Sequence, residues 1–352
     1  MSAEWITAAR PAFGLRRRVT DPLPLVDLEP DCSGLDRLDG RSVVSVTDVA
    51  RDEVRELFTL AARLQTGLFR PAAPLAGKIL VTAFFEPSTR TRLSFESAAH
   101  RLGASVLSIS GLKSTSVHKG ESLADTGFML GTYADLVVLR HVAASSAAEI
   151  RCGGMSVPLI NGGNGCDEHP TQALADWYAL VKWRPELAEP NPPFDRRISL
   201  CVLGTPSLMR SIRSFLRAAA RHFPNAVREL LVVSDDPDPV NPELAAELAH
   251  AGIAYSCADG QPDLTEYDVI YQNSLTLVGQ DYEMLGSKIR LDADTPLHPD
   301  AVVMHPLARQ DELGTDLDDT PRNLYFDQVQ GALFVRQALL LAVTGRLSGV
   351  LG

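Results

Sequence analysis

Short apolar runs alternate with longer amphipathic stretches from about residue 41 onward. The runs that predict strands in the first half cover residues 78–85, 105–110, 136–141 and 157–160. Those in the second half cover residues 198–203, 230–234, 254–257, 268–271 and 302–304. Amphipathic segments such as 92–102 and 121–133 separate the first set. Because buried strands connected by helices form parallel sheets, this pattern predicts an α/β fold with doubly wound parallel sheets.

A proline-rich break divides the two series. It runs from Arg184 to Pro193, so we predict one domain over residues 41–183 and a second over 184–323. The last segment, 324–352, begins with a long and largely apolar helix that we expect to pack back on the first domain. Ligands of open α/β sheets bind beyond the carboxyl ends of the strands. The two domains therefore predict a site in the cleft between them.

The first forty residues differ from the rest of the chain. They contain Arg16, Arg17 and Arg18, then a stretch rich in proline and aspartate, and they have no apolar signal core. A loosely ordered N-terminal extension over residues 1–40 is the interpretation we favour. A processed transit peptide is the alternative.

Composition excludes several classes of protein. The 352-residue chain has a net charge of −11, whereas general nucleic-acid binding relies on a basic surface. The sequence has no run of about 18 apolar residues, the length that would predict a membrane span. The five cysteines form no CxxC pair, which fits a reducing cytoplasm and supports neither a zinc site nor a disulfide framework. A phosphate-bearing ligand would thus need a local basic pocket.

A cluster of hydroxyl and basic side chains follows the first predicted strand. Ser88, Thr89, Arg90 and Thr91 come directly after it and open a helix. Free backbone N–H groups at a helix N-terminus, together with hydroxyls and a guanidinium, predict an anion site. Ordinary N-capping by Ser88 or Thr89, with Arg90 in solvent, is the alternative.

Two further basic positions suit the same ligand. Thr115, Ser116 and Lys119 lie in a loop whose hydroxyls and ammonium group suit phosphate, although surface loops often have this composition. Arg140 ends the third predicted strand, where it either points into the cleft or caps the strand at the surface.

Two segments offer groups for a carbonyl and an amide. His169 and Gln172 are three residues apart at a predicted helix start, so they share one helix face and could hold an oxyanion and an amide. A simple capping role for His169 is the alternative. After the strand at 302–304, the backbone carbonyls of residues 305–309 are candidate hydrogen-bond acceptors.

In this order and spacing, the segments resemble the aspartate/ornithine carbamoyltransferase family, and the aspartate type most closely. The resemblance covers nearly everything from about Arg41 to Leu347. The motifs that carry it are Ser-Thr-Arg-Thr at 88–91, Lys-Gly-Glu at 119–121, Arg-His at 140–141, His-Pro-Thr-Gln at 169–172, His-Pro-Leu at 305–307 and the last-helix pattern from Tyr325 to Leu339. His-Pro-Leu favours the aspartate type, because ornithine enzymes have His-Cys-Leu there.

The resemblance implies an enzyme that moves the carbamoyl group of carbamoyl phosphate to an amine, with no cofactor and no metal. The first domain would bind carbamoyl phosphate and the second the acceptor. The implied phosphate ligands are Ser88, Thr89, Arg90, Thr91 and Arg140, with Thr115 or Ser116 and Lys119 from a neighbouring subunit. Thr91, Arg140 and His169 would polarise the carbamoyl oxygen, and Gln172 and the Leu307 carbonyl would hold the amino group. A site shared between subunits implies a homotrimer.

The acceptor side departs from the family pattern. Arg210 matches the arginine that contacts the acceptor's carboxylate, and Glu86 the residue that steadies it. Ser274 and Thr276, however, replace an Arg-x-Gln that grips the second carboxylate of aspartate, and no Lys or Arg follows until Lys288. A charge-assisted hydrogen bond contributes about 1.5–3 kcal/mol. We therefore predict an amino-acid-like acceptor for which free aspartate is not optimal.

Two other hypotheses stay open. The chain could be a genuine aspartate carbamoyltransferase of pyrimidine synthesis in which Arg290 or Arg309 replaces the lost arginine. It could also be a catalytically inactive structural homologue, although the intact phosphate-side residues argue against this. Ala308 stands where the family has proline, so we expect no cis peptide bond between Leu307 and Ala308. The sequence names neither the acceptor nor a regulatory partner.

Overall fold

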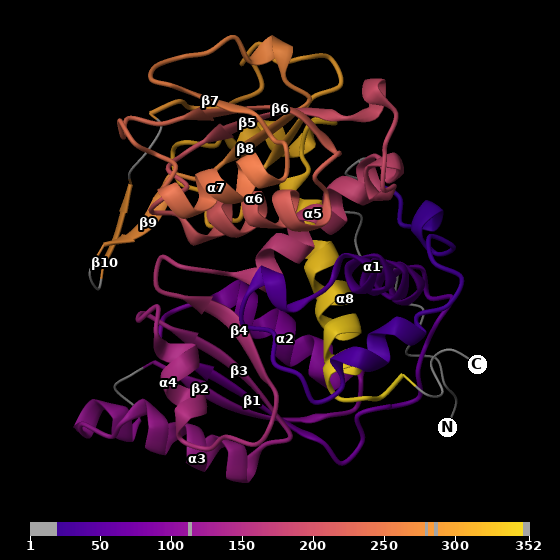
Figure 1. Ribbon diagram of the computed structural model, residues 1–352, viewed down its shortest axis with the longest axis vertical. Helices are drawn as coiled ribbons and strands as arrows, with labels where there is room; N and C mark the ends of the chain where they lie inside the picture. Colours follow the sequence, from indigo (N-terminus) through magenta and orange to yellow (C-terminus); the bar gives the residue numbers. More distant parts are fainter. Residues whose placement is uncertain (1–19, 112–114, 279–280, 285–287, 348–352) are drawn as a thin grey trace, which may run out of the picture.

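The computed structural model describes residues 20–111, 115–278, 281–284 and 288–347 of the chain. Two parallel β-sheets lie at opposite ends of the view in Figure 1, and helices pack between and around them. The predicted class, two doubly wound α/β units, is confirmed. We call the part around the first sheet the first unit and the part around the second sheet the second unit.

The first sheet has the strand order β2-β1-β3-β4, with all neighbours parallel. Its strands are β1 (Ile79–Phe84), β2 (Ser105–Ser110), β3 (Leu136–His141) and β4 (Leu159–Asn164). Successive side chains point to opposite faces, so Val138 joins one apolar cluster and Val137 another. Burial on both faces explains why β1 and β3 are largely apolar.

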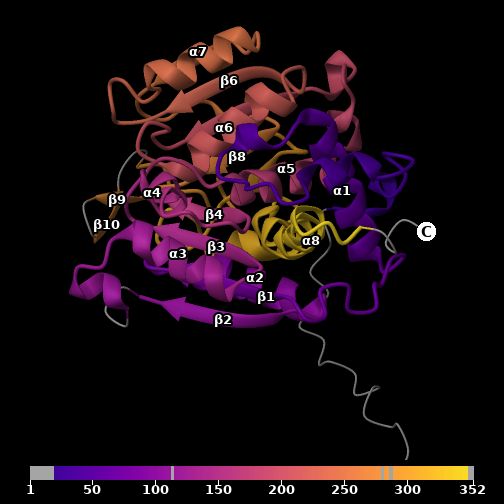
Figure 2. The same ribbon diagram turned by 60° about the horizontal axis from the view of Figure 1, so that its bottom comes forward.

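Five helices flank this sheet within the first half of the chain. They are α1 (Arg51–Thr66), α2 (Thr89–Arg101), α3 (Leu123–Tyr133), α4 (Ser146–Cys152) and α5 (Pro170–Trp183). The Val138 cluster contains residues of α1, α2 and α5, and the Val137 cluster contains residues of α3 and α4. Figure 2 shows α3 and α4 together on one side of the sheet and α1 on the other.

The second sheet is also parallel, in the order β11-β8-β5-β6-β7. Its strands are β5 (Ile198–Leu203), β6 (Val227–Val233), β7 (Tyr255–Ala258), β8 (Val269–Gln272) and β11 (Val302–Met304). One face packs on α6 (Arg210–His222) and α7 (Pro242–His250). The other packs on irregular segments that contribute Leu291, Leu313 and Leu317. The unit is therefore closed by loops on the side away from the first unit.

The last helix, α8 (Tyr325–Val343), lies beside α1, α2 and α5 (Figure 1). A Cβ atom on Gly331 would lie 2.9 Å from Cδ1 of Tyr178, so glycine permits the close approach of α8 and α5. One apolar cluster runs from the first sheet through α8 and α5 to α6 and the second sheet. This continuous core fixes the two units relative to each other.

The stretch from 20 to 40 packs against the first unit. Leu25, Leu35 and Leu38 are fully buried in the main core cluster. This differs from the loose extension expected for residues 1–40, because the leucines among the polar residues supply an apolar face. Residues 1–19 lie outside the described part of the chain.

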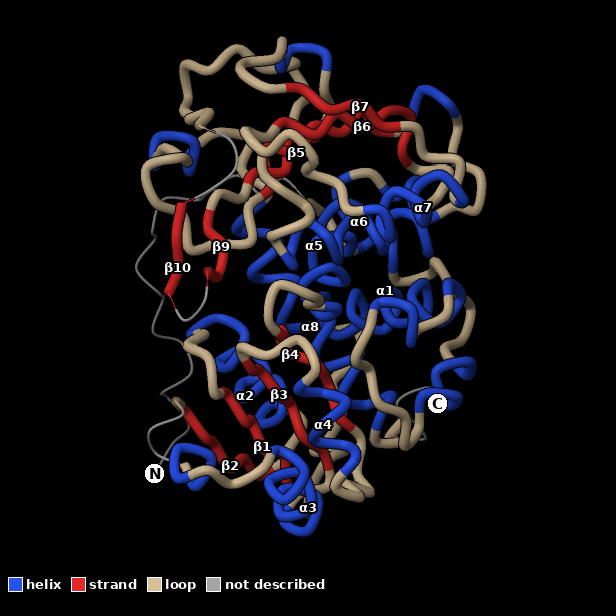
Figure 3. The backbone as a smooth tube through the Cα atoms, turned by 60° about the vertical axis from the view of Figure 1, so that its left-hand side comes forward, coloured by secondary structure: helices blue, strands red, loops and turns tan. Residues whose placement is uncertain are grey.

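A β-hairpin follows β8, in a segment for which we predicted no strand. Strands β9 (Leu275–Val278) and β10 (Asp281–Met284) pair antiparallel in a sheet of their own. Figure 3 shows the hairpin extending from the second unit toward the first. Only Gly279 and Gln280 separate the strands, a spacing and a glycine typical of tight hairpins. That local signal could have predicted it.

We predict that His222 makes the stability of the fold depend on pH. Its Nε2 lies 3.2 Å from the Val46 carbonyl oxygen, so it ties α6 to the first unit, and burial lowers its pKa to about 4. A depressed histidine pKa stabilises the fold above pH 6.5, and this stabilisation is lost as pH falls toward 4. The loss would reach about 3 kcal/mol in the free energy of unfolding.

Urea unfolding at a series of pH values checks this. The His222→Gln variant should lose less stability between pH 6.5 and 4 than the unchanged protein. His100→Asn, at an exposed histidine on α2, is the matched control and should behave like the unchanged protein. Equal losses in all three proteins would contradict the role of His222.

Candidate active site

A cavity of about 620 Å³ lies between the two units, where the carboxyl ends of several strands meet. Its lining comes from the segments after β1, β3, β4, β5, β8 and β11 and from α8. This is where the topology of open α/β sheets places ligands. Nine predicted site residues line it: Ser88, Thr89, Arg90, Thr91, Arg140, His169, Gln172, Arg210 and Leu307.

The N-terminus of α2 faces this cavity. Ser88 is the N-cap residue, yet its side chain makes no capping hydrogen bond. Simple capping by Ser88 therefore does not account for the cluster. Thr89 and Arg90 are exposed at the rim, and Thr91 is buried beneath them. The first turn thus presents hydroxyls, backbone N–H groups and a guanidinium to one space, which suits an anion.

A buried carboxylate joins two of the arginines that line the site. Glu86 accepts hydrogen bonds from Arg210 at 2.9 Å (Nη1 to Oε2) and 2.5 Å (Nη2 to Oε1). Its Oε1 also accepts from Arg140 Nη2, and Arg140 Nη1 donates to the Gly162 carbonyl at 3.1 Å. Because Arg140 belongs to β3 and Arg210 to α6, the carboxylate links the first unit to the second.

The imidazole ring of His169 is buried and contacts Thr91. Its Nε2 lies 3.3 Å from Thr91 Oγ1, and its Nδ1 has no hydrogen-bond partner among the described residues. Burial lowers its pKa well below the usual value, and the charges of Arg140, Arg210 and Arg336 lower it further. The imidazole is therefore neutral at pH 7, so it can donate one hydrogen bond to a carbonyl oxygen.

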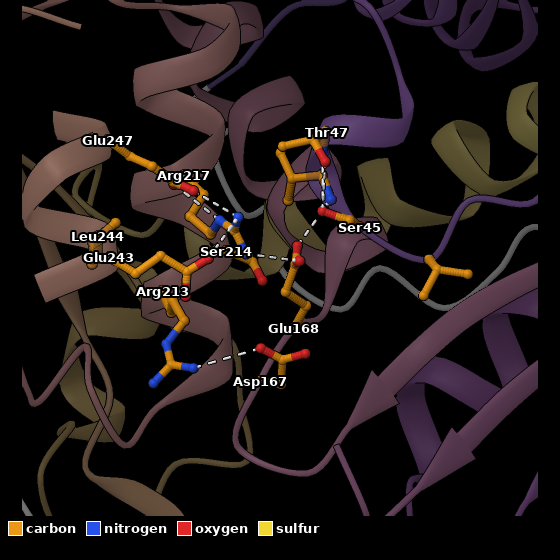
Figure 4. Close-up of polar contacts among 12 residues, drawn as sticks. Ser45, Thr47, Asp167, Glu168, Arg213, Ser214, Arg217, Glu243, Leu244 and Glu247 are labelled. Carbon is orange, nitrogen blue, oxygen red and sulfur yellow. Dashed lines mark hydrogen bonds and ion pairs between the residues drawn. The ribbon is translucent and has the colours of Figure 1, made fainter. Parts of the chain in front are cut away.

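The backbone before α5 is fixed by α6 of the second unit (Figure 4). The His169 N–H donates to Ser214 Oγ at 2.9 Å. Beside it, Glu168 accepts from Arg217 Nη1 and from the Val46 N–H, each at 2.9 Å. Burial raises the pKa of Glu168 against the effect of these donors. Sequence reasoning missed Ser214 and Arg217, whose partners are distant in the chain.

Arg336 is a further cation at the cavity that sequence reasoning left without a role. It is buried on α8, donates to Ser94 Oγ, and its guanidinium carbon lies 4.9 Å from the centroid of the Phe95 ring. Burial lowers its pKa to about 9, so it remains charged at pH 7. Its Nε has no hydrogen-bond partner among the described residues. An arginine within an otherwise apolar helix was the available signal.

The segment after β11 is held by the ring of His305. Its Nδ1 accepts from the Leu307 N–H at 2.9 Å, so the ring proton lies on Nε2, which is 2.9 Å from Glu312 Oε1. Leu307 has φ of 54°, in the left-handed region that glycine favours. The peptide bond between Leu307 and Ala308 is cis, so our expectation from the missing proline was wrong. The Leu307 carbonyl is the group predicted to face the ligand.

The acceptor end of the cavity has few charges. Besides Arg210 it is lined by Leu208, Met209, Ser211 and Asn273, and Asn273 donates to Ser211 Oγ at 3.0 Å. It lies after β5 and β8, where the resemblance places the acceptor.

The two replaced positions lie next to this end. Ser274 is buried, its Oγ has no hydrogen-bond partner among the described residues, and it does not line the cavity. Thr276 belongs to β9, and its side chain lies outside the description. The predicted contact of these two residues with an acceptor stays a prediction.

Two arginines considered as replacements for the family's arginine are engaged elsewhere. Arg309 donates two hydrogen bonds to Asp318, from Nη1 to Oδ1 at 2.5 Å and from Nη2 to Oδ2 at 2.7 Å. Arg290 Nε lies 3.7 Å from Asp292 Oδ2, and Lys288 Nζ lies 3.0 Å from Asp235 Oδ2. Among the described residues that line the cavity, none of these three cations appears.

Family models match both halves of the chain. A model described as the carbamoyl-P binding domain of aspartate/ornithine carbamoyltransferase matches residues 41–182. A second, described as the Asp/Orn binding domain, matches residues 231–343. The chain belongs to the aspartate/ornithine carbamoyltransferase family. The predicted family, and with it the prediction of a carbamoyltransferase, is confirmed.

Individual relatives agree with the family models. The chain is 36% identical to the aspartate carbamoyltransferase catalytic subunit of Thermococcus onnurineus, covering 88% of this chain and 99% of that one. It is 33% identical to the corresponding subunit of Alkaliphilus oremlandii, covering 88% and 92%. Among solved structures, aspartate transcarbamoylase from Trypanosoma cruzi in complex with carbamoyl phosphate and aspartate has a TM-score of 0.74, with 31% identity over 90% of this chain and 99% of that one.

Three residues that the family resemblance assigned to the phosphate lie away from this chain's own cavity. Thr115, Ser116 and Lys119 are absent from the described lining, and Lys119 is exposed. Ser116 Oγ donates to Glu121 at 2.7 Å. Their contribution from a neighbouring subunit stays a prediction, as does the trimer.

No metal site and no membrane helix is found in the described part of the carbamoyltransferase chain. No group of three or more His, Cys, Asp or Glu side chains there is arranged to hold a metal ion. In the same residues, no helix combines the length and the apolar character that crossing a membrane requires.

We predict that Arg90→Gln weakens the binding of inorganic phosphate about tenfold, because it removes one charge-assisted hydrogen bond at the rim of the cavity. Isothermal titration calorimetry at fixed ionic strength measures this. Arg151→Gln, at an exposed arginine of α4 outside the cavity, is the matched control and should bind phosphate normally. Equal affinities for all three proteins would place the anion elsewhere.

Proposed function

We propose that the chain transfers the carbamoyl group of carbamoyl phosphate to the amine of an amino-acid-like acceptor. The observation that carries this is the charge of the cavity. Its described lining holds four arginines, Arg90, Arg140, Arg210 and Arg336, and no carboxylate, although the whole chain has a net charge of −11. A doubly charged phosphate is the ligand that such a lining favours.

The phosphate would lie at the N-terminus of α2. Ser88, Thr89, Arg90 and Thr91 present their donors there, and Arg140 reaches the same space from β3. The Trypanosoma cruzi relative was crystallised with carbamoyl phosphate, which supports this choice of donor. The helix dipole and the free N–H groups would add to the attraction.

The carbamoyl group would extend toward α5 and the 305–308 segment. Thr91, Arg140 and neutral His169 would donate to its carbonyl oxygen and stabilise the negative charge that develops there. The acceptor's amine nitrogen attacks the carbamoyl carbon, the bond from that carbon to the bridging phosphate oxygen breaks, and the released phosphate takes the amine proton. Much of the rate would come from holding the two substrates in line.

The acceptor is proposed to be an amine other than free aspartate. Ser274 and Thr276 occupy the positions of the family's Arg-x-Gln, and residues 275–287 contain no Lys or Arg. The hydrogen bonds of Arg309 to Asp318 support this view, as does the absence of both Arg309 and Arg290 from the described lining of the cavity. Arg210 would hold the one carboxylate that the acceptor shares with amino acids.

The second candidate is a genuine aspartate carbamoyltransferase. The names of the relatives from Thermococcus onnurineus and Alkaliphilus oremlandii favour it. In that case the second carboxylate of aspartate would be held by groups other than the family's arginine. A cytoplasmic location is expected under either candidate, from the cysteine pattern alone.

The amine panel separates the two candidates. Purified protein is incubated with carbamoyl phosphate and aspartate, ornithine, diaminopropionate or monocarboxylate amino acids, and the carbamoylated products are identified by mass. We expect a product from an amine other than aspartate and weak inhibition by succinate, because the second carboxylate lacks its arginine. The His169→Ala variant controls for uncatalysed carbamoylation. A product from aspartate alone, with tight inhibition by succinate, would establish the aspartate enzyme instead.

We further propose a homotrimer whose sites are shared, with Lys119 and Thr115 or Ser116 reaching the phosphate of a neighbour. The exposed position of Lys119, outside its own chain's cavity, supports this.

Mixing two inactive chains tests the shared site. Chains carrying Lys119→Ala and chains carrying Arg140→Ala should regain activity when reassembled together, because some sites then combine two unchanged halves. Mixing Arg140→Ala with His169→Ala is the control, since both changes fall in the same half and every site keeps a defect. Verified mixed assemblies that stay inactive in the first case would count against sharing.

A further inference from the structure

Asp176 is a buried carboxylate between the two units that no step above uses. It lies on α5, one turn after Gln172, and is completely buried. Gln172 Nε2 and Gln328 Nε2 each donate to its Oδ1 at 2.7 Å, and the Tyr271 hydroxyl donates to Oδ2 at 2.8 Å. Three donors from α5, α8 and β8 therefore converge on one side chain. Burial raises the pKa of Asp176 to about 7, against the effect of these hydrogen bonds.

The first consequence concerns which end of Gln172 faces the cavity. A side-chain amide has one end that donates and one that accepts, and its orientation is set by its partners. Because Asp176 Oδ1 accepts, the Nε2 end of Gln172 turns toward it. The Oε1 end is then left for the cavity that Gln172 lines. A reversed amide would present a donor there instead.

The second consequence reaches the 305–307 segment through Gln328. Its Nε2 end is turned to Asp176, and its Oε1 end accepts from the His305 N–H at 3.0 Å. The His305 ring in turn accepts from the Leu307 N–H at 2.9 Å. One carboxylate thus lies at the start of a chain of hydrogen bonds that ends at Leu307, whose carbonyl is predicted to face the ligand.

We propose that Asp176 is a positioning residue that makes the site selective for the carbamoyl amino group. By turning Gln172 and, through Gln328 and His305, by fixing Leu307, it presents two acceptors, Gln172 Oε1 and the Leu307 carbonyl oxygen, to an NH₂ group. This inference rests on the proposed function, because it requires that a carbamoyl group occupy the cavity.

The matching probe is acetyl phosphate, which replaces that NH₂ group with a methyl group and keeps the phosphate and the carbonyl. A site with two fixed acceptors prefers carbamoyl phosphate, because a methyl group leaves both acceptors without a partner. Inorganic phosphate reports on the phosphate side alone, which Asp176 does not contact. The ratio of the affinities for carbamoyl and acetyl phosphate is therefore the readout, and general damage to the fold would not change it selectively.

The experiment measures the three affinities by titration calorimetry for the unchanged protein and for Asp176→Leu. We expect Asp176→Leu to lower the preference for carbamoyl over acetyl phosphate about tenfold, corresponding to two lost hydrogen bonds, while the affinity for inorganic phosphate changes less than about twofold. Asp176→Asn should retain the preference. Its Oδ1 can still accept from both glutamines, and its Nδ2 can donate to the Tyr271 oxygen.

Two further variants keep the inference testable if Asp176→Leu does not fold. Gln328→Met removes the hydrogen bonds of Gln328 to Asp176 and to His305 but leaves Gln172 in contact with Asp176, and it should lower the preference about threefold. Tyr271→Phe removes the third hydrogen bond to Asp176 without touching either glutamine, so it should reduce stability and leave the preference unchanged. An unchanged preference in a folded Asp176→Leu or Gln328→Met protein would overturn the inference. If the unchanged protein itself did not prefer carbamoyl phosphate, the proposed function would fail first.

Discussion

Glu86 lies directly after β1, and its carboxylate accepts hydrogen bonds from Arg140 of the first unit and Arg210 of the second. A carboxylate and two guanidiniums in a buried place are costly to desolvate, and they are tolerated only because each satisfies the others. Removing Glu86 would leave two like charges facing each other in the interior. The arrangement of the cavity, and the way the units meet at it, depends on this contact.

This contact also explains how an acidic protein maintains a basic site. Glu86 compensates part of the charge of Arg140 and Arg210, while Arg90 and Arg336 add two further cations to the lining of the cavity. Burial lowers the pKa of His169, and the charges of Arg140, Arg210 and Arg336 lower it further, so the ring stays neutral. A neutral imidazole can donate one hydrogen bond to the carbonyl oxygen. It adds no positive charge that would draw the phosphate away from its own site. The arginines of this cluster are thus partly neutralised by Glu86, and they also help to keep His169 unprotonated.

The sequence predicted the parts of this structure that are encoded locally. The runs at 136–141 and 198–203 became strands with the same bounds, because burial on both faces requires continuous apolar character. The run at 105–110 also kept its bounds, as an edge strand that is largely exposed. Ser88, Thr89, Arg90 and Thr91 were found together because they are consecutive and open one helix. Asp176, Gln328 and Ser214 were missed, since each acts through a partner from a distant segment. Nothing in their immediate neighbours distinguishes them from ordinary polar helix residues.

The acceptor side was harder to predict for a related reason. Ser274 precedes a hairpin and Thr276 lies in its first strand, so what these residues face depends on how the hairpin lies against the rest of the chain. The phosphate side, by contrast, is fixed to a helix N-terminus and to strands of a continuous core. A donor half built on rigid elements and an acceptor half built partly on a hairpin can change independently. In this arrangement, substitutions can change the specificity for the acceptor more easily than the specificity for the carbamoyl donor.

The hydrogen bond from the His169 backbone to Ser214 joins a residue of the first unit to a helix of the second. The first unit therefore holds every group that we assign to the phosphate within one chain, and the second unit supplies the contact that fixes the backbone at His169. A first half on its own would keep the side chains around the phosphate but lose this contact. The second half thus contributes a constraint on the site as well as part of the pocket.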